Sequence, residues 1–77
     1  MTTKDIKNKM NSTCEEFRKI TGIFLNKGKL APTNEDLKHF EDTMYTTSEV
    51  YTKFGERAGK LYDKLKRLSE ELGAAND

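Results

Sequence analysis

The sequence contains one cysteine, Cys14, and one histidine, His39, and this scarcity excludes two common ways of stabilising a small protein. One cysteine forms no internal disulfide, and one cysteine with one histidine is too few for a metal site. The sequence also lacks a paired acid and base, a phosphate-cradling glycine loop and an activated nucleophile. We therefore expect no metal, no cofactor, no catalytic residue and no enzymatic activity.

Long apolar runs and a net charge of one sign are missing as well. No stretch is apolar and long enough to span a membrane, and no signal peptide is visible, so we expect a cytoplasmic protein without a membrane partner. The 14 basic and 13 acidic residues give a net charge of +1. A dedicated binder of double-stranded nucleic acid usually carries a marked basic excess, so we do not expect that partner either.

What the sequence does have is strict periodicity in its second half. Apolar residues recur there in alternating steps of three and four, which predicts one long helix, from a Thr33 cap to about Leu72, with Gly73 after its end. We call this set the heptad seam. Its members are Leu37, Phe40, Met44, Thr47, Tyr51, Phe54, Ala58, Leu61, Leu65, Leu68 and Leu72.

A first helix is predicted from a Thr2 cap, with Asp5 as the acidic third residue, to about Lys27. Gly28 would end it, and Pro32 lies in the loop that follows. The second helix would begin with a similar cap, Thr33 followed by Asp36. The apolar stripe of the first helix consists of Ile6, Met10, Thr13, Phe17, Ile20 and Phe24.

These patterns predict an all-α fold in which residues 1–77 form a single domain, an antiparallel two-helix hairpin with a longer second helix. Pairing the two stripes places Phe24 opposite Leu37 and Thr13 opposite Thr47, so that a polar layer fixes the register. The N-terminal end of the first helix would then lie opposite Phe54. The seam residues beyond it would stay uncovered, namely Ala58, Leu61, Leu65, Leu68 and Leu72.

Each exposed leucine forfeits on the order of 1.5–3 kcal/mol of burial, so the uncovered residues predict a partner surface. A second copy of the chain is the simplest partner, which predicts a homo-oligomeric helical bundle with Ala58, Leu61, Leu65, Leu68 and Leu72 at its interface. Gly55 and Gly59 suggest a close helix crossing in that oligomer, although they are also compatible with tolerated surface glycines.

A stripe of cations flanks the seam, one position before its apolar residues. We call Lys53, Arg57, Lys60, Lys64 and Arg67 the basic stripe. It is compatible with a solvated helix flank whose side-chain stems cover apolar surface. It is also compatible with an anion site in which Tyr62 stacks on a base. For the second interpretation the candidate ligand-binding residues are Lys53, Arg57, Lys60, Tyr62 and Lys64.

The segment Leu37 to Met44 resembles part of a family of phage helical hairpins, the anti-CBASS cyclic-oligonucleotide sponges. The shared pattern is an apolar residue, two spacers, a second apolar residue, two acids, a small residue and a methionine. The likeness covers roughly Phe17 to Tyr51 and also includes a preceding helix and a short loop with a proline. The chain has Thr46 and Thr47 where that family usually carries an aromatic residue, so the resemblance extends to scaffold positions only.

The resemblance implies a small, non-enzymatic oligomer that sequesters cyclic oligonucleotide signals and thereby evades bacterial immunity. The long uncovered seam instead favours a protein-interaction module, such as a small chaperone or an inhibitor of a host protein, which would capture a partner helix. The sequence leaves both functions open.

Overall fold

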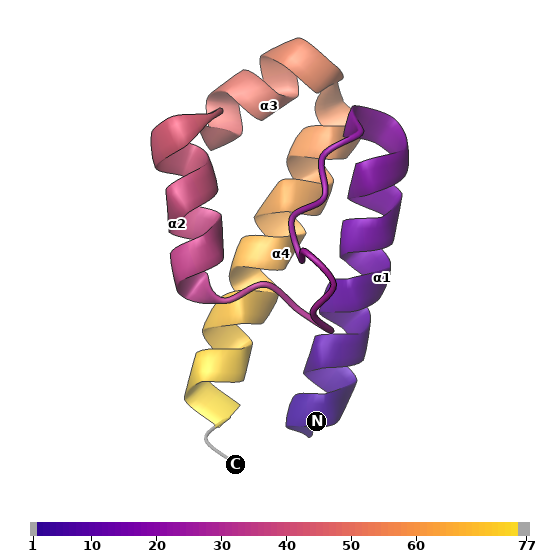
Figure 1. The fold of residues 1–77 in the computed structure, drawn as a ribbon, viewed down its shortest axis with the longest axis vertical. Helices are drawn as coiled ribbons and strands as arrows, with labels where there is room; N and C mark the ends of the chain where they lie inside the picture. Colours follow the sequence, from indigo (N-terminus) through magenta and orange to yellow (C-terminus); the bar gives the residue numbers. More distant parts are fainter. Residues whose placement is uncertain (1, 76–77) are drawn as a thin grey trace.

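A computed structural model describes residues 2–75 and shows a bundle of helices, with no strand among these residues. The elements are α1 (Thr3–Thr21), α2 (Asn34–Thr43), α3 (Thr47–Phe54) and α4 (Glu56–Ala75). Helices α1, α2 and α4 run side by side, and α3 crosses one end from α2 to α4 (Figure 1). The predicted all-helical class is confirmed.

The predicted long second helix is wrong, because two breaks divide it into α2, α3 and α4. At the first break Thr46 caps α3, accepting a hydrogen bond from the backbone N–H of Glu49 while the Glu49 carboxylate accepts one from the Thr46 N–H. At the second break Gly55 has φ +99°, a conformation that favours glycine. The chain can therefore fold α3 across the end of the bundle.

Folding α3 back lets the chain cover its own apolar residues. Val50 of α3 is fully buried, and the rings of Tyr45 and Phe54 meet edge to face at 5.4 Å between centroids. In a single straight helix Tyr45 and Phe54 would lie roughly 13 Å apart along the axis, so their rings could not meet. Their burial offsets the helical hydrogen bonds lost at the two breaks.

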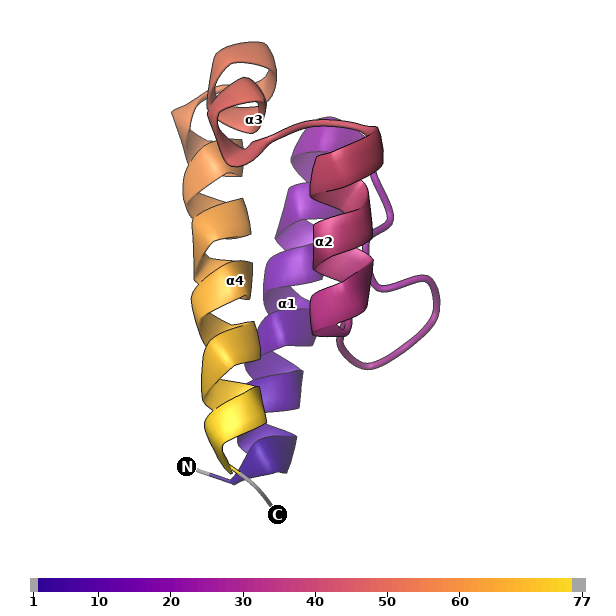
Figure 2. The same ribbon diagram turned by 90° about the vertical axis from the view of Figure 1, so that its left-hand side faces the viewer.

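The first helix is also shorter than expected. It ends at Thr21, because Gly22 adopts a left-handed φ of +76° and its N–H bonds back to the Arg18 carbonyl. Residues 22–33 then form a loop that lies on the side of the molecule away from α4 (Figure 2). Both predicted helix starts are confirmed, since Thr2 caps α1 and Thr33 caps α2 through capping boxes.

Three aromatic side chains from three helices form the centre of the core. Phe17 of α1 lies 6.3 Å from Phe40 of α2 and 6.1 Å from Tyr62 of α4, measured between ring centroids. The Tyr62 hydroxyl donates a buried hydrogen bond of 3.1 Å to the Leu37 carbonyl. This arrangement satisfies the one polar atom that the tyrosine brings into the core.

The predicted pairing of the stripes is consequently wrong. Helix α1 packs mainly against α4, so the residues that were expected to lie beyond its reach are the ones it covers. Thr13 and Thr47 do not form a polar layer with each other: Thr13 donates to the Lys9 carbonyl, and Thr47 donates to the Glu41 carboxylate. Met44, a member of the heptad seam that was expected to be covered by the first helix, is 54% exposed.

The seam residues assigned to an oligomer interface are packed inside the single chain. Ala58, Leu65 and Leu68 are buried, and Leu61 and Leu72 are partly buried against the same core. The premise of the oligomer prediction, an uncovered leucine seam, is therefore wrong. The hydrophobic core is completed by α1 and the folded-back α3, without a second copy.

Candidate functional site

A groove of about 780 Å³ runs along α4, and we call it the basic groove. Tyr51 of α3 forms one wall of the groove, and α4 supplies the rest. The lining residues are Tyr51, Glu56, Arg57, Lys60, Leu61, Lys64 and Arg67. Four cations and two side chains with apolar surface therefore share one concavity.

The spacing along α4 brings these cations together. Arg57, Lys60, Lys64 and Arg67 follow one another at intervals of three, four and three residues, so they lie on one face of the helix. Ten residues separate the first from the last, which corresponds to roughly 15 Å along the axis. The groove thus presents a row of positive charge long enough for more than one phosphate group.

Two of the four cations already have acidic neighbours. Arg57 lies 3.4 Å from a Glu16 carboxylate oxygen on α1, and Lys60 lies 3.0 Å from Glu56. Both pairs are exposed, and exposed pairs contribute little to stability, about 0–1 kcal/mol. Within the described residues Lys64 and Arg67 have neither a hydrogen bond nor an ion pair. An incoming anion would meet two unpaired cations and two loosely held ones.

Tyr51 is held in the groove by two contacts with α4. Its hydroxyl donates a 2.7 Å hydrogen bond to the Asp63 carboxylate, which raises the pKa of the phenol above its ordinary value of 10.0. Its ring packs against Gly59, where an added Cβ would lie only 2.5 Å from the ring atom Cδ1. The ring is half-buried, so part of its surface remains available to a ligand.

The close approach predicted at Gly59 therefore occurs within one chain. The partner of the glycine is the ring of Tyr51. Gly55 has a different role, since its positive φ allows the turn between α3 and α4. Neither glycine needs a second copy to explain it.

The structure gathers part of the predicted ligand set and separates the rest. Arg57, Lys60 and Lys64 line the basic groove together with Arg67. Lys53 belongs to α3 and lies 5.5 Å above the Tyr45 ring, outside the groove lining. Tyr62 is 0% exposed, and burial raises the pKa of its phenol, so the prediction that its ring stacks on a ligand is wrong.

Four members of the groove were not among the candidate ligand-binding residues, namely Tyr51, Glu56, Leu61 and Arg67, although Arg67 belonged to the basic stripe. Tyr51 was placed in the heptad seam, and Leu61 was placed at an oligomer interface. The signal that points to Tyr51 is the glycine at position 59, because a glycine inside a helix leaves room for an aromatic ring from a neighbouring element.

Outside the groove, residues 2–75 offer neither an accessible thiol nor a cluster of metal ligands. Cys14 is buried, and desolvation raises the pKa of its thiol to about 12, which keeps it unreactive. Residues 2–75 hold no group of three or more potential metal ligands. None of the described helices has both the length and the apolar character needed to cross a membrane.

No family model matches the chain, and neither a curated protein nor a solved structure matches it. The chemistry of the basic groove is therefore the basis on which a function is proposed.

Proposed function

We propose that the chain is a non-enzymatic binding protein that sequesters a small ligand bearing several phosphates, a cyclic oligonucleotide in the first instance, in the basic groove. The observation that carries the proposal is the convergence of Arg57, Lys60, Lys64 and Arg67 beside the half-buried ring of Tyr51. Arginine and lysine bind phosphate oxygens, and an aromatic ring offers a base a stacking surface.

The electrostatics of the groove support this choice. The four cations outnumber the one lining carboxylate, Glu56, so the groove keeps an excess of positive charge that a polyanion would neutralise. Arg57 and Lys60 would exchange their exposed carboxylate partners for phosphates at little cost. Lys64 and Arg67 would gain partners that they lack within the described residues. Binding would thus recruit all four cations without disturbing the core.

The proposed mode of action is retention, without a chemical step. A sequestering protein needs cations to hold phosphates and apolar surface to hold bases, and Tyr51 and Leu61 provide the second. Stacking of one base on an aromatic ring is worth about 1–3 kcal/mol. Retention in the groove requires no self-association, and the leucines that suggested an oligomer are packed against the core. The same burial removes the basis for capture of a helix by the leucine seam.

The test is a thermal-shift and calorimetric comparison of cyclic dinucleotides and trinucleotides with the linear forms and with inorganic triphosphate. A ligand at one hundred times its Kd should stabilise the protein by about 2.7 kcal/mol. The double variant Arg57→Glu with Lys60→Glu should abolish both the heat and the shift. The matched control, Lys4→Glu with Lys38→Glu, changes the net charge equally at two exposed positions outside the groove.

Two results would count against the proposal. One is the lack of any heat or thermal shift across the panel of cyclic nucleotides. The other is equal weakening by the groove variant and by the control variant, because that would indicate attraction by net charge alone. If triphosphate and the cyclic ligands bound equally well, the groove would still be an anion site, but recognition of the bases would be ruled out.

A further inference from the structure

A second concavity lies on the opposite side of the molecule, between the 22–33 loop and α2. It has a volume of about 150 Å³, and we call it the Phe24 hollow. Its lining residues are Ile23, Phe24, Leu25, Lys27, Asp36, His39, Phe40, Thr43 and Met44. It shares no residue with the basic groove, and the proposed function makes no use of it.

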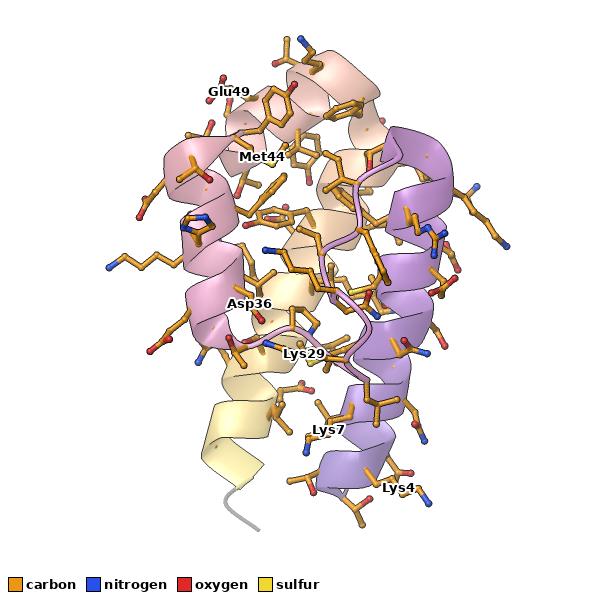
Figure 3. The ribbon with its side chains drawn as sticks, viewed as in Figure 1. Lys4, Lys7, Lys29, Asp36, Met44 and Glu49 are labelled. Atoms are coloured by element: carbon orange, nitrogen blue, oxygen red, sulfur yellow. The ribbon has the colours of Figure 1, made fainter. Side chains whose placement is uncertain are left out.

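The Phe24 hollow is apolar both at its base and at its edges. Leu25 and Phe40 are buried members of the core, whereas Phe24 is 43% exposed and Met44 is 54% exposed. Met44 follows the end of α2, and Figure 3 shows it at the opposite end of that helix from Asp36. Large apolar side chains exposed around one concavity are typical of an interaction site.

The size of the hollow limits what it can hold. A cavity of about 150 Å³ accommodates one benzene molecule in a protein core, so this hollow fits one apolar side chain. A stable association of two folded proteins buries about 800 Å² on each partner, which is far more than the surface around a single such hollow. We therefore assign the hollow to one anchor residue of a short peptide segment, and not to a second copy of this chain.

The charges around the hollow indicate what should flank that anchor. The Arg18 guanidinium lies 4.8 Å above the Phe24 ring, and Lys27 lines the hollow. Neither cation forms an ion pair within residues 2–75. The one lining carboxylate, Asp36, already accepts hydrogen bonds from Lys29 Nζ at 3.2 Å and from the Thr33 backbone N–H at 2.9 Å. The charge left for a partner is therefore positive.

We propose that the Phe24 hollow is a docking site for a peptide segment of another protein, in which one aromatic or leucine side chain is flanked by acidic residues. The anchor would enter between Phe24 and Met44, and the flanking carboxylates would reach Arg18 and Lys27. Methionine suits such an edge, because its flexible side chain adapts to anchors of different shape.

The experiment titrates three blocked pentapeptides into the 77-residue chain and follows its amide chemical shifts by nuclear magnetic resonance. The first peptide has a central phenylalanine with two acidic residues on each side. The second replaces phenylalanine by alanine, and the third replaces the acids by lysines. We expect saturable shifts in residues 23–27 and 36–44 with the first peptide, and at least tenfold weaker binding of the other two.

Substitutions around the Phe24 hollow test which side chains contact the peptide. Phe24→Ser and Met44→Ser should each weaken the acidic phenylalanine peptide at least fivefold without unfolding, because both side chains are exposed. Lys27→Glu should reverse the preference toward the lysine-flanked peptide. Leu30→Ser is the control, since Leu30 is equally exposed but does not line the Phe24 hollow.

Three outcomes would overturn the proposal: no saturable shift, equal binding of the acidic and basic peptides, or equal loss in the Leu30 control. Sedimentation that showed self-association of the wild type, lost in Phe24→Ser, would assign the hollow to a second copy instead. None of these results bears on the basic groove, so the two proposals fail separately.

Discussion

Replacement of Gly59 by alanine is a sharp test of how α3 packs on α4. Carbon atoms in contact normally lie 3.5–4.0 Å apart, and an added Cβ would lie 2.5 Å from Tyr51 Cδ1. The ring would have to move by about 1 Å or more to restore the normal separation of carbon atoms. Overpacking of this kind costs about 1–3 kcal/mol. The movement also weakens the hydrogen bond from the Tyr51 hydroxyl to the Asp63 carboxylate, and a hydrogen bond to a charged group contributes about 1.5–3 kcal/mol when intact.

One effect works in the opposite direction. Alanine favours a helix over glycine by about 1 kcal/mol, so the net loss of stability in Gly59→Ala should be about 2 kcal/mol. In a domain of this size 1 kcal/mol shifts Tm by about 4–8 °C, so we expect Tm to fall by roughly 10 °C. Gly73→Ala is the matched control, because Gly73 lies in the same helix and an added Cβ there meets nothing within 4 Å. That variant should gain stability.

The assay is thermal and urea unfolding followed by circular dichroism, with a double-mutant cycle. In a Tyr51→Ala background the ring is gone, so Gly59→Ala should no longer destabilise the protein and should behave like Gly73→Ala. If Gly59→Ala in the wild-type background were as stable as Gly73→Ala, the proposed packing of α3 on α4 would be wrong. The groove would then lack its Tyr51 wall as well.

Three further predictions concern single side chains. Tyr62→Phe removes the donor to the buried Leu37 carbonyl and should lower the free energy of unfolding by about 1–3 kcal/mol in urea titrations; an unchanged midpoint would contradict that bond. Cys14 should react with a thiol reagent at pH 8 only after unfolding, because burial raises the pKa of its thiol to about 12; rapid modification of the folded protein would show that the thiol is accessible. The backbone N–H of Thr33 lowers the pKa of Asp36 below 3.8, so its contribution to stability is present above pH 3.8 and is lost as pH falls through the folded-state pKa. Between pH 5 and pH 2 the free energy of unfolding in urea should therefore fall less for Asp36→Asn than for the wild type. An equal fall in both proteins would show that Asp36 does not contribute to the pH dependence of stability.

Sequence periodicity predicted the helical class. The capping boxes predicted two of the helix starts, because a capping box is a local feature. Thr2 with Asp5 and Thr33 with Asp36 specify their caps within four residues. The same local signal also occurs at Thr46 with Glu49, where it begins α3. At that point the uninterrupted heptad seam favours one continuous helix, so the periodicity masks the cap.

Long-range packing explains why the rest of the fold could not be read from the pattern. A heptad pattern indicates which residues of one helix share a face. A turn such as the one at Gly55 reorients the preceding helix relative to the following one, so residues on its two sides no longer share a face. Residues Arg57, Lys60 and Lys64 all follow that turn within α4, so their predicted common face is preserved. Lys53 precedes it, and the turn takes Lys53 out of the groove. Tyr62 lies on the α1-facing side of α4, which only the tertiary pairing determines.

The contact between Tyr51 and Gly59 has a consequence for hydrogen exchange. Helix α3 has eight residues and a break at each end, so it is a candidate for a unit that opens locally while α1 and α4 stay folded. Tyr51 connects α3 to α4 through its contacts with Gly59 and Asp63, and it also forms a wall of the groove. Any ligand that touches this ring favours the closed form of α3 by mass action and slows exchange of the α3 amides. An anion held only by Lys64 and Arg67 leaves that exchange rate unchanged, so α3 acts as an internal reporter of how deeply a ligand enters.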